Sequence, residues 1–367
     1  MIQNPSSAEK YISSPVLKQS SRNLSMECCK LIASFFVVFI HVPFPGQAGK
    51  LVDCLARFAV PTFLMISGYF NYQADSVAIA RRLKHILYLI LVGTAVDLCW
   101  GCVATELEGG STIAYLRAAI LDPIEVIRWV VLHFHPYAGH LWYLNAIATC
   151  YMALYVYTRF RGEEKVNYTP FYYLCLNLFV ILFIFGIVDP ANGRDSLVNT
   201  RDGWLMGLPM FGIGLFIREY QERIFERFDL PAWKLIAVIV GGALFSVLQW
   251  QTVLIGIMPF GTVLEVLALM LLLVSHPNAS PKRKWAGKLM LSFGPISTWI
   301  YILHLTVLSV YVRVMQPAVA AALGAAEGWL CPWIVLGMSL VAAVAAEWIQ
   351  KTVKRLRRRN KGAVSCK

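Results

Sequence analysis

Charged residues are scarce in this chain. They make up 15% of its 367 residues, whereas hydrophobic residues make up 58%. A soluble domain averages about 25% charged residues, so this composition excludes an ordinary soluble protein and predicts one embedded in a lipid bilayer. The net charge of +12 does not indicate a nucleic-acid partner, because the basic residues punctuate apolar segments and form no patch interleaved with aromatics.

Several missing motifs exclude further classes of protein. No short apolar run is followed by a small-residue cleavage site, so no signal peptide is expected and residues 1–25 are interpreted as a flexible cytoplasmic tail. The nine cysteines lie mostly within apolar segments and are interpreted as small buried hydrophobic residues, not as a disulfide framework or a metal site. The chain lacks a phosphate-binding glycine loop, a G-x-S-x-G elbow and an HExxH motif. It also shows no internal repeat, which disfavours a transporter built from symmetric halves.

Long apolar runs predict about ten transmembrane helices and an all-α polytopic membrane fold. Residues 105–139 carry charges among apolar residues at helical spacing, which predicts an interfacial helix or a re-entrant segment within the membrane domain of residues 26–350. The expected spans are 26–43, 52–70, 84–104, 140–159, 170–189, 203–218, 231–250, 255–275, 291–312 and 329–350.

Lysine and arginine residues predict the orientation of these spans. With the N-terminus inside, 24 of them fall on the inner side and 6 on the outer side. The positive-inside rule therefore predicts that both termini are cytoplasmic. The basic run Lys351 to Arg359 could be a nuclear localisation or RNA-binding signal. Directly after the last helix it is better explained as the start of a basic cytoplasmic tail, residues 351–367, that is attracted to anionic lipid.

The first expected helix carries one cation and one imidazole. Lys30 and His41 are 11 positions apart, which corresponds to ~16 Å of helical rise. Ionisable groups are costly inside hydrocarbon, so such a pair indicates a functional site. The alternative is that Lys30 snorkels to one interface while His41 merely ends the helix at the other.

The second span contains a further cation and a Ser-Gly pair. Arg57 within an apolar run needs a carboxylate, a phosphate or backbone carbonyls, and Asp53 one turn earlier could be a purely structural partner. Ser67 and Gly68 allow two interpretations. The Ser67 hydroxyl could be a functional group at a place where Gly68 lets another backbone come close, or the two small residues could simply pack against a neighbouring helix.

The fourth span opens with an aromatic and histidine-rich stretch. His133, His135 and His140 raise the question of a metal, but no carboxylate or cysteine supports them locally, so no metal site is predicted. Trp142 and Tyr143 suit an interfacial aromatic belt, or an outward-facing cleft that His140 would also line.

Other ionisable residues also lie at the expected membrane depth. They are Asp97, Glu265 and His304, and Arg201 opens the glycine- and proline-rich sixth span. Each could be a paired structural residue. Together they exceed what a passive anchor needs, so the sequence predicts an internal polar site.

These residues resemble the acyltransferase 3 family, a bacterial group of integral membrane O-acyltransferases. Lys30 and His41 match its first-helix pattern of Arg or Lys, ten residues and His. Many members carry Arg at the first of these positions. Lys30 lacks the planar guanidinium group with which Arg can form two hydrogen bonds to one phosphate or carboxylate. Four other family elements follow in order at Arg57 to Tyr69, His140 to Leu144, Arg201 to Gly214, and Ile300 to His304.

The resemblance implies a multi-pass cell-membrane enzyme that uses acyl-CoA, with acetyl-CoA the expected donor substrate, and holds no bound cofactor. The acceptor would be a hydroxyl of a glycan, a lipid-linked sugar or another extracytoplasmic molecule, with membrane lipids as the surrounding partners. His41 is the expected general base and Lys30 the expected donor-holding cation. The expected substrate- or donor-binding residues are Arg57, Ser67, His140, Trp142, Tyr143, Arg201, Glu265 and His304. The competing function is a small-molecule transporter built on the same membrane domain.

Overall fold

The structure is a computed structural model. It describes residues 23–120, 139–161, 165–184, 202–252, 259–277, 287 and 289–365. Every regular element within these ranges is helical, so the predicted all-α fold class is confirmed for the described part of the chain.

The described residues form thirteen α-helices. They are α2 (Leu24–His41), α3 (Gly46–Ala56), α4 (Ala59–Tyr69), α5 (Ser76–Leu107), α6 (Thr112–Ile120), α8 (Trp142–Arg161), α9 (Thr169–Phe183), α11 (Leu208–Arg227), α12 (Ala232–Thr252), α13 (Phe260–Ser275), α15 (Phe293–Val310), α16 (Gln316–Leu323) and α17 (Glu327–Ser365). Short 3-10 turns form η1 (Gly139–Leu141) and η5 (Gly324–Ala326), and π turns form η3 (Gly203–Gly207) and η4 (Tyr311–Met315).

Several of these segments have the length and apolar character of membrane spans. Five qualify within the described residues: Leu24–His41, Gly46–Tyr69, Ser76–Leu107, Ala232–Gln251 and Phe293–Leu356. Two shorter apolar helices are Thr169–Phe183 and Phe260–Ser275. The chain therefore has the character of a membrane protein, while the count of ten spans and the cytoplasmic termini stay predictions.

The span predicted over 52–70 overlaps the candidate membrane span Gly46–Tyr69, but it is not one continuous helix. The structure divides it into α3 and α4, with the break at Arg57 and Phe58. Pro61 explains the break, because it has no N–H to donate to the carbonyl of Arg57 four residues earlier.

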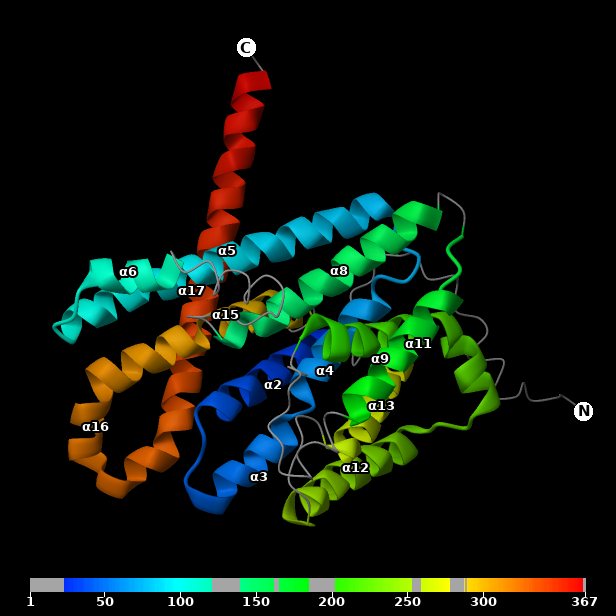
Figure 1. Cartoon of the computed structure of the whole chain (residues 1–367), viewed down its shortest axis with the longest axis horizontal. Coiled ribbons are helices and arrows are strands. Elements are labelled where there is room, and N and C mark those ends of the chain that lie inside the picture. The colour runs from blue at the N-terminus through cyan, green and yellow to red at the C-terminus, as the bar shows by residue number, and fades with distance from the viewer. Residues whose placement is uncertain are drawn as a thin grey trace, which may run out of the picture.

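Other helices run past their predicted ends. The side chain of Asp75 accepts a hydrogen bond from the Ala78 N–H and starts α5 eight residues before the predicted position 84. Helix α17 continues from the expected span into the basic tail as far as Ser365, and Figure 1 shows its C-terminal part projecting from the bundle. In the expected interfacial segment, α6 runs beside α5, and residues 121–138 lie outside the described residues.

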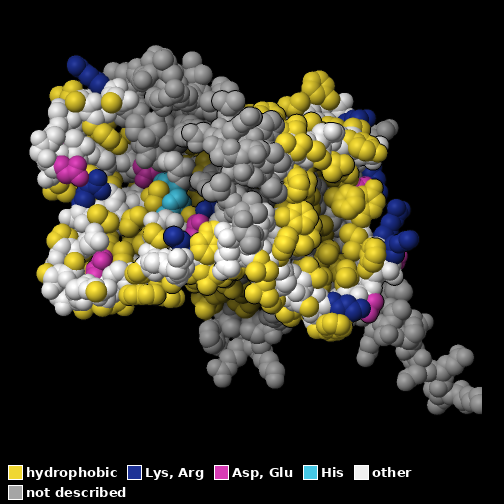
Figure 2. Space-filling view, turned by 60° about the horizontal axis from the view of Figure 1, so that its bottom comes forward, with side chains coloured by type: hydrophobic (Ala, Val, Ile, Leu, Met, Phe, Trp, Pro, Cys, Tyr) yellow, Lys and Arg dark blue, Asp and Glu magenta, His cyan; other side chains and the backbone are white. Residues whose placement is uncertain are grey.

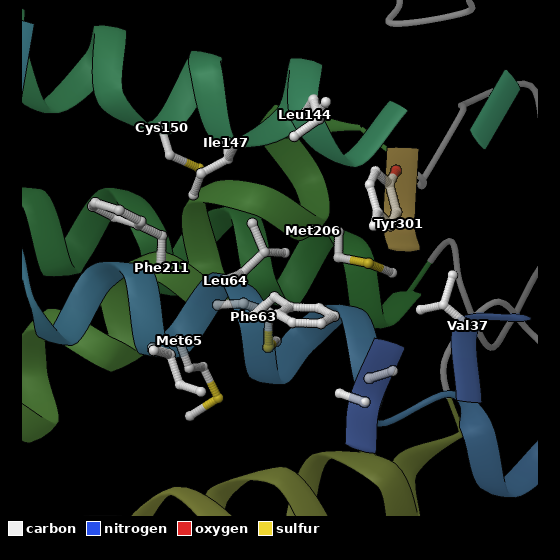
Figure 3. Packing of buried hydrophobic residues seen from close by; sticks show 14 of the residues in the cluster. Val37, Phe63, Leu64, Met65, Leu144, Ile147, Cys150, Met206, Phe211 and Tyr301 are labelled. Carbon is white, nitrogen blue, oxygen red and sulfur yellow. The ribbon is translucent and has the colours of Figure 1, made fainter. Parts of the chain in front are cut away.

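Helix α4 lies within the hydrophobic core. Phe63 and Leu64 lie on the side of α4 that faces α8, near Leu144 and Ile147 (Figure 3). On another side its backbone touches that of α11, since a Cβ atom on Gly68 would lie 1.9 Å from the Phe211 carbonyl oxygen. This contact holds the neighbouring Ser67 in a defined place.

Candidate functional site

A cavity of about 1610 Å³ lies at the Lys30 end of α2. Its charged lining residues come from four helices, α2, α5, α11 and α17, and include Lys30, Arg82, Arg218, Glu222, Lys351 and Lys354. Its aromatic lining comes from the interior, where Tyr143 and Tyr301 stand with their rings 5.2 Å apart. The cavity therefore joins a charged rim to an aromatic inner wall.

Lys30 faces this cavity as one member of an ion pair. Its Nζ lies 3.0 Å from Oε1 of Glu27, one turn earlier on α2. The Glu27 side chain is buried, and its Oε2 points to the first turn of α15, where a Cβ atom on Gly294 would lie 1.9 Å away. A carboxylate is favoured beside a helix N-terminus. The pair thus anchors Lys30 against α15 at the cavity wall.

The start of α2 is fixed to the end of α13. The Asn23 amide donates to the Leu273 carbonyl oxygen at 3.0 Å, while its Oδ1 accepts from the Met26 N–H and caps the helix. Nearby, the Ser25 hydroxyl donates to the His276 carbonyl oxygen at 2.5 Å. These bonds set the depth at which Lys30 enters the bundle.

His41, the last residue of α2, belongs to a cluster of three histidines. Its ring centroid lies 5.0 Å from that of His304 on α15, which in turn lies 5.1 Å from that of His140 in η1. His140 and His304 are buried, whereas His41 is exposed. Figure 2 shows a histidine side chain in a hollow of the surface, with acidic and basic side chains beside it. The cluster therefore reaches the surface through His41.

Asp97 of α5 joins the buried side of this cluster. Its Oδ2 lies 3.9 Å from His140 Nε2, and its Oδ1 accepts a hydrogen bond from the Thr306 hydroxyl at 2.5 Å. Four elements that are distant in sequence thus bring one carboxylate and three imidazoles together.

Tyr301 separates the cavity from the histidine cluster. It lines the cavity, and its ring also contacts those of His140 and His304. Its hydroxyl donates to the His140 carbonyl oxygen. Ser67 lines the same cavity and lies close to the phenol group of Tyr143. The inner end of the cavity is therefore one side chain away from the histidines.

A comparison with known protein families identifies the family of this chain. The acyltransferase domain model of the acyltransferase 3 family matches residues 23–349, nearly the whole chain. The chain belongs to the acyltransferase 3 family. No curated protein and no solved structure matches it significantly. Membership of this family makes the protein a membrane acyltransferase.

Not every expected site residue of this acyltransferase lies at the cavity or the cluster. Arg57 pairs with Asp53, with Nη2 2.6 Å from Oδ2, and does not line the cavity. Glu265 is buried where α13 crosses α12, and Trp142 is half-buried; both lie outside the cavity lining. Arg201 lies outside the described residues, as do the two histidines at positions 133 and 135.

A metal site is not seen in the part of the chain that the structure describes. No group of three or more His, Cys, Asp or Glu side chains there has a geometry that could hold an ion. Cys99 and Cys102, spaced as a CxxC pair on α5, are both free thiols, and Cys99 is exposed and not the buried residue expected.

Sequence reasoning missed several residues of the candidate site. Glu27 could have been found from its position three residues before Lys30, which is the spacing of a helical ion pair. Lys351 and Lys354 belong to the basic tail that was expected only to attract lipid, yet both line the cavity. No local signal placed Arg82 or Arg218 there, because their position depends on how the helices pack.

Proposed function

We propose that this acyltransferase moves an acyl group, with acetyl the expected case, from cytoplasmic acyl-CoA to a hydroxyl of an extracytoplasmic acceptor. A cell-envelope glycan or a lipid-linked sugar would fit that description. The observation that carries the proposal is that α2 links a large cavity at Lys30 to a histidine cluster at His41. A helical rise of ~16 Å separates the two residues.

The cavity suits a large anionic donor. Small-molecule sites usually occupy about 300–1,000 Å³, and this cavity of about 1610 Å³ is larger. Arg82 is hydrogen-bonded to the Phe70 carbonyl and the Asn71 side chain, and Arg218 to the Tyr69 hydroxyl. These partners are uncharged, so they do not offset the positive charge of either guanidinium group, which can then attract phosphate. The positive-inside rule assigns this end of α2 to the cytoplasm, where acyl-CoA is made.

The histidine cluster suits the acceptor. His41 is exposed at the opposite end of α2, and an imidazole can take a proton near neutral pH. In this mechanism His41 removes the hydroxyl proton while the oxygen attacks the thioester carbonyl. The C–O bond forms, the C–S bond breaks, and the thiolate of CoA takes up the proton. Lys30 holds an anionic or carbonyl part of the donor at the cavity wall.

Replacement of His41 tests the assignment of the base. Purified His41→Ala protein in liposomes is expected to lose acyl transfer from labelled acetyl-CoA by about 10²-fold or more, because general-base catalysis contributes that much. Binding of CoA, measured separately, should stay near the wild-type value. Acyl transfer at the wild-type rate would overturn the role of His41.

Lys30 is tested by a charge-preserving and a charge-removing variant. Lys30→Arg should keep most of the activity, whereas Lys30→Ala should raise the KM for acetyl-CoA. Lys50→Ala is the matched control, since Lys50 is exposed on α3 and does not line the cavity. If Lys30→Ala behaves like Lys50→Ala, Lys30 has no part in donor binding.

The same liposomes distinguish the enzyme from a transporter. Consumption of acetyl-CoA with acylation of the acceptor supports the enzyme. Movement of an unmodified small molecule across the membrane without use of CoA would support the transporter instead.

A further inference from the structure

Backbone carbonyls of α15 define the tautomers of the two buried histidines. His304 Nδ1 lies 2.7 Å from the Tyr301 carbonyl oxygen, and His140 Nε2 lies 3.0 Å from the Ile302 carbonyl oxygen. A carbonyl oxygen can only accept, so these two nitrogens carry the hydrogen in the neutral rings. Nε2 of His304 and Nδ1 of His140 are then the proton acceptors.

His304 Nε2 is a buried base next to His41. Among the described residues it has no hydrogen-bond partner, and the His304 side chain is fully buried. A buried polar atom without a hydrogen-bond partner destabilises the folded state, so the presence of this one calls for an explanation. The ring centroids of His41 and His304 are 5.0 Å apart, a spacing at which an N–H···N hydrogen bond can join two imidazoles.

The carboxyl group of Asp97 lies beside His140, the second of the two buried histidines. Asp97 Oδ2 lies 3.9 Å from His140 Nε2 and has no hydrogen-bond partner in the described part of the chain. The described titratable side chains in ring contact with His304 are His41, His140 and Tyr301. A positive charge on His304 would therefore be stabilised chiefly by Asp97, through His140.

We propose that His304, His140 and Asp97 form a proton relay behind His41; this inference rests on the proposed acyl transfer. One nitrogen of His41 takes the proton of the acceptor hydroxyl, and its other nitrogen passes a proton to Nε2 of His304. Asp97 stabilises the resulting imidazolium through His140. When the C–S bond of the thioester breaks, the same route returns one proton through His41 to the thiolate. Protons therefore balance, and no other reactant is needed.

Two nearly isosteric substitutions separate the relay from a structural role. In H304N the amide nitrogen takes the place of Nδ1 and can still donate to the Tyr301 carbonyl, but no base remains at the place of Nε2. In D97N an amide oxygen can still accept from the Thr306 hydroxyl, but the charge is gone. H276N is the control, since His276 is exposed at the end of α13.

The relay predicts a defect in kcat and in proton transfer. H304N should lower kcat by about 10²-fold, as expected for loss of a proton-transferring group, with little change in the KM for acetyl-CoA. D97N should lower kcat by a smaller factor. The solvent isotope effect on kcat should change in both variants and should not change in H276N. Thermal unfolding in detergent shows whether each variant is folded.

The outcomes distinguish the two proposals. If the wild type is active and folded H304N and D97N match it in kcat and isotope effect, the relay alone is overturned. A wild type that transfers no acyl group would overturn the proposed function together with the relay.

Discussion

Tyr301 stands between two environments of different chemistry. On one side it lines the large cavity, and on the other its ring contacts His140 and His304. Its hydroxyl also donates to the His140 carbonyl oxygen, which fixes the short turn η1 against α15. A single side chain therefore controls both the wall and the position of a cluster residue.

Substitutions of Tyr301 should separate these two effects. Tyr301→Phe keeps the ring and loses one hydrogen bond, so unfolding should become easier by about 1 kcal/mol while the donor stays protected from water. Tyr301→Ala should open the cavity to the cluster and increase release of CoA thiol in the absence of acceptor. Thiol release is followed with a chromogenic reagent. Equal release by Tyr301→Ala and the wild type would contradict the role of the ring as a partition.

Gly294 allows the Glu27 carboxylate to approach α15. A Cβ atom there would lie 1.9 Å from Glu27 Oε2, so Gly294→Ala must displace the carboxylate and with it the Lys30 pair. We expect a rise in the KM for acetyl-CoA and a loss of stability of about 1–3 kcal/mol, as for other overpacked sites.

Gly337→Ala is the control for this substitution. A Cβ atom on Gly337 of α17 meets nothing within 4 Å, so the change should leave stability unchanged or slightly improved. Equal KM values in Gly294→Ala and Gly337→Ala would show that the position of Glu27 does not affect donor binding.

At the scale of elements, the crossing of α4 and α11 depends on two glycines. A Cβ atom on Gly68 would lie 1.9 Å from the Phe211 carbonyl oxygen, and one on Gly214 would lie 2.0 Å from the Met65 carbonyl oxygen. Because the obstructing atoms belong to the backbone, neither helix can yield by a side-chain rotation. Small residues at such crossings are how helices approach closely in membranes.

Gly68→Ala should push α4 away from α11 and move Ser67 out of place. We expect a loss of stability of at least about 1–3 kcal/mol and reduced acyl transfer. Gly241→Ala serves as the control, because a Cβ atom at that helical position in α12 meets nothing within 4 Å. Thermal unfolding of both variants in the same detergent tests the difference. Equal stability would contradict the close crossing.

At the scale of the whole molecule, the proposed function depends on which side of the membrane the cavity faces. The cavity contains Lys351 and Lys354 of α17, so its rim should lie on the same side of the membrane as the C-terminus. We expect epitope tags at both ends of the chain to be protected in right-side-out vesicles. A tag between α2 and α3 should be accessible there, because it follows His41. Accessible termini would reverse the assigned donor side.

Single residues of the site could be found from the sequence when they stand out in their own segment. Lys30, His41, His140 and His304 are polar residues in apolar runs, and the structure places Lys30 at the cavity and the three histidines together. Arg57 also stood out as a polar residue in an apolar run, yet it pairs with Asp53 at the end of α3 and does not line the cavity. A polar residue in an apolar run indicates that a partner is needed, without indicating which partner.

The sequence by itself determined the helical fold class and the family, since these depend on composition and on motifs within single helices. It also predicts an orientation from its basic residues. Only the tertiary structure decided the partners: Asp97 with His140 and Thr306, Glu27 with Gly294, and Tyr301 between cavity and cluster. The physical reason is that these contacts join residues of different helices. Their distances depend on how the helices cross, which no spacing along the chain encodes.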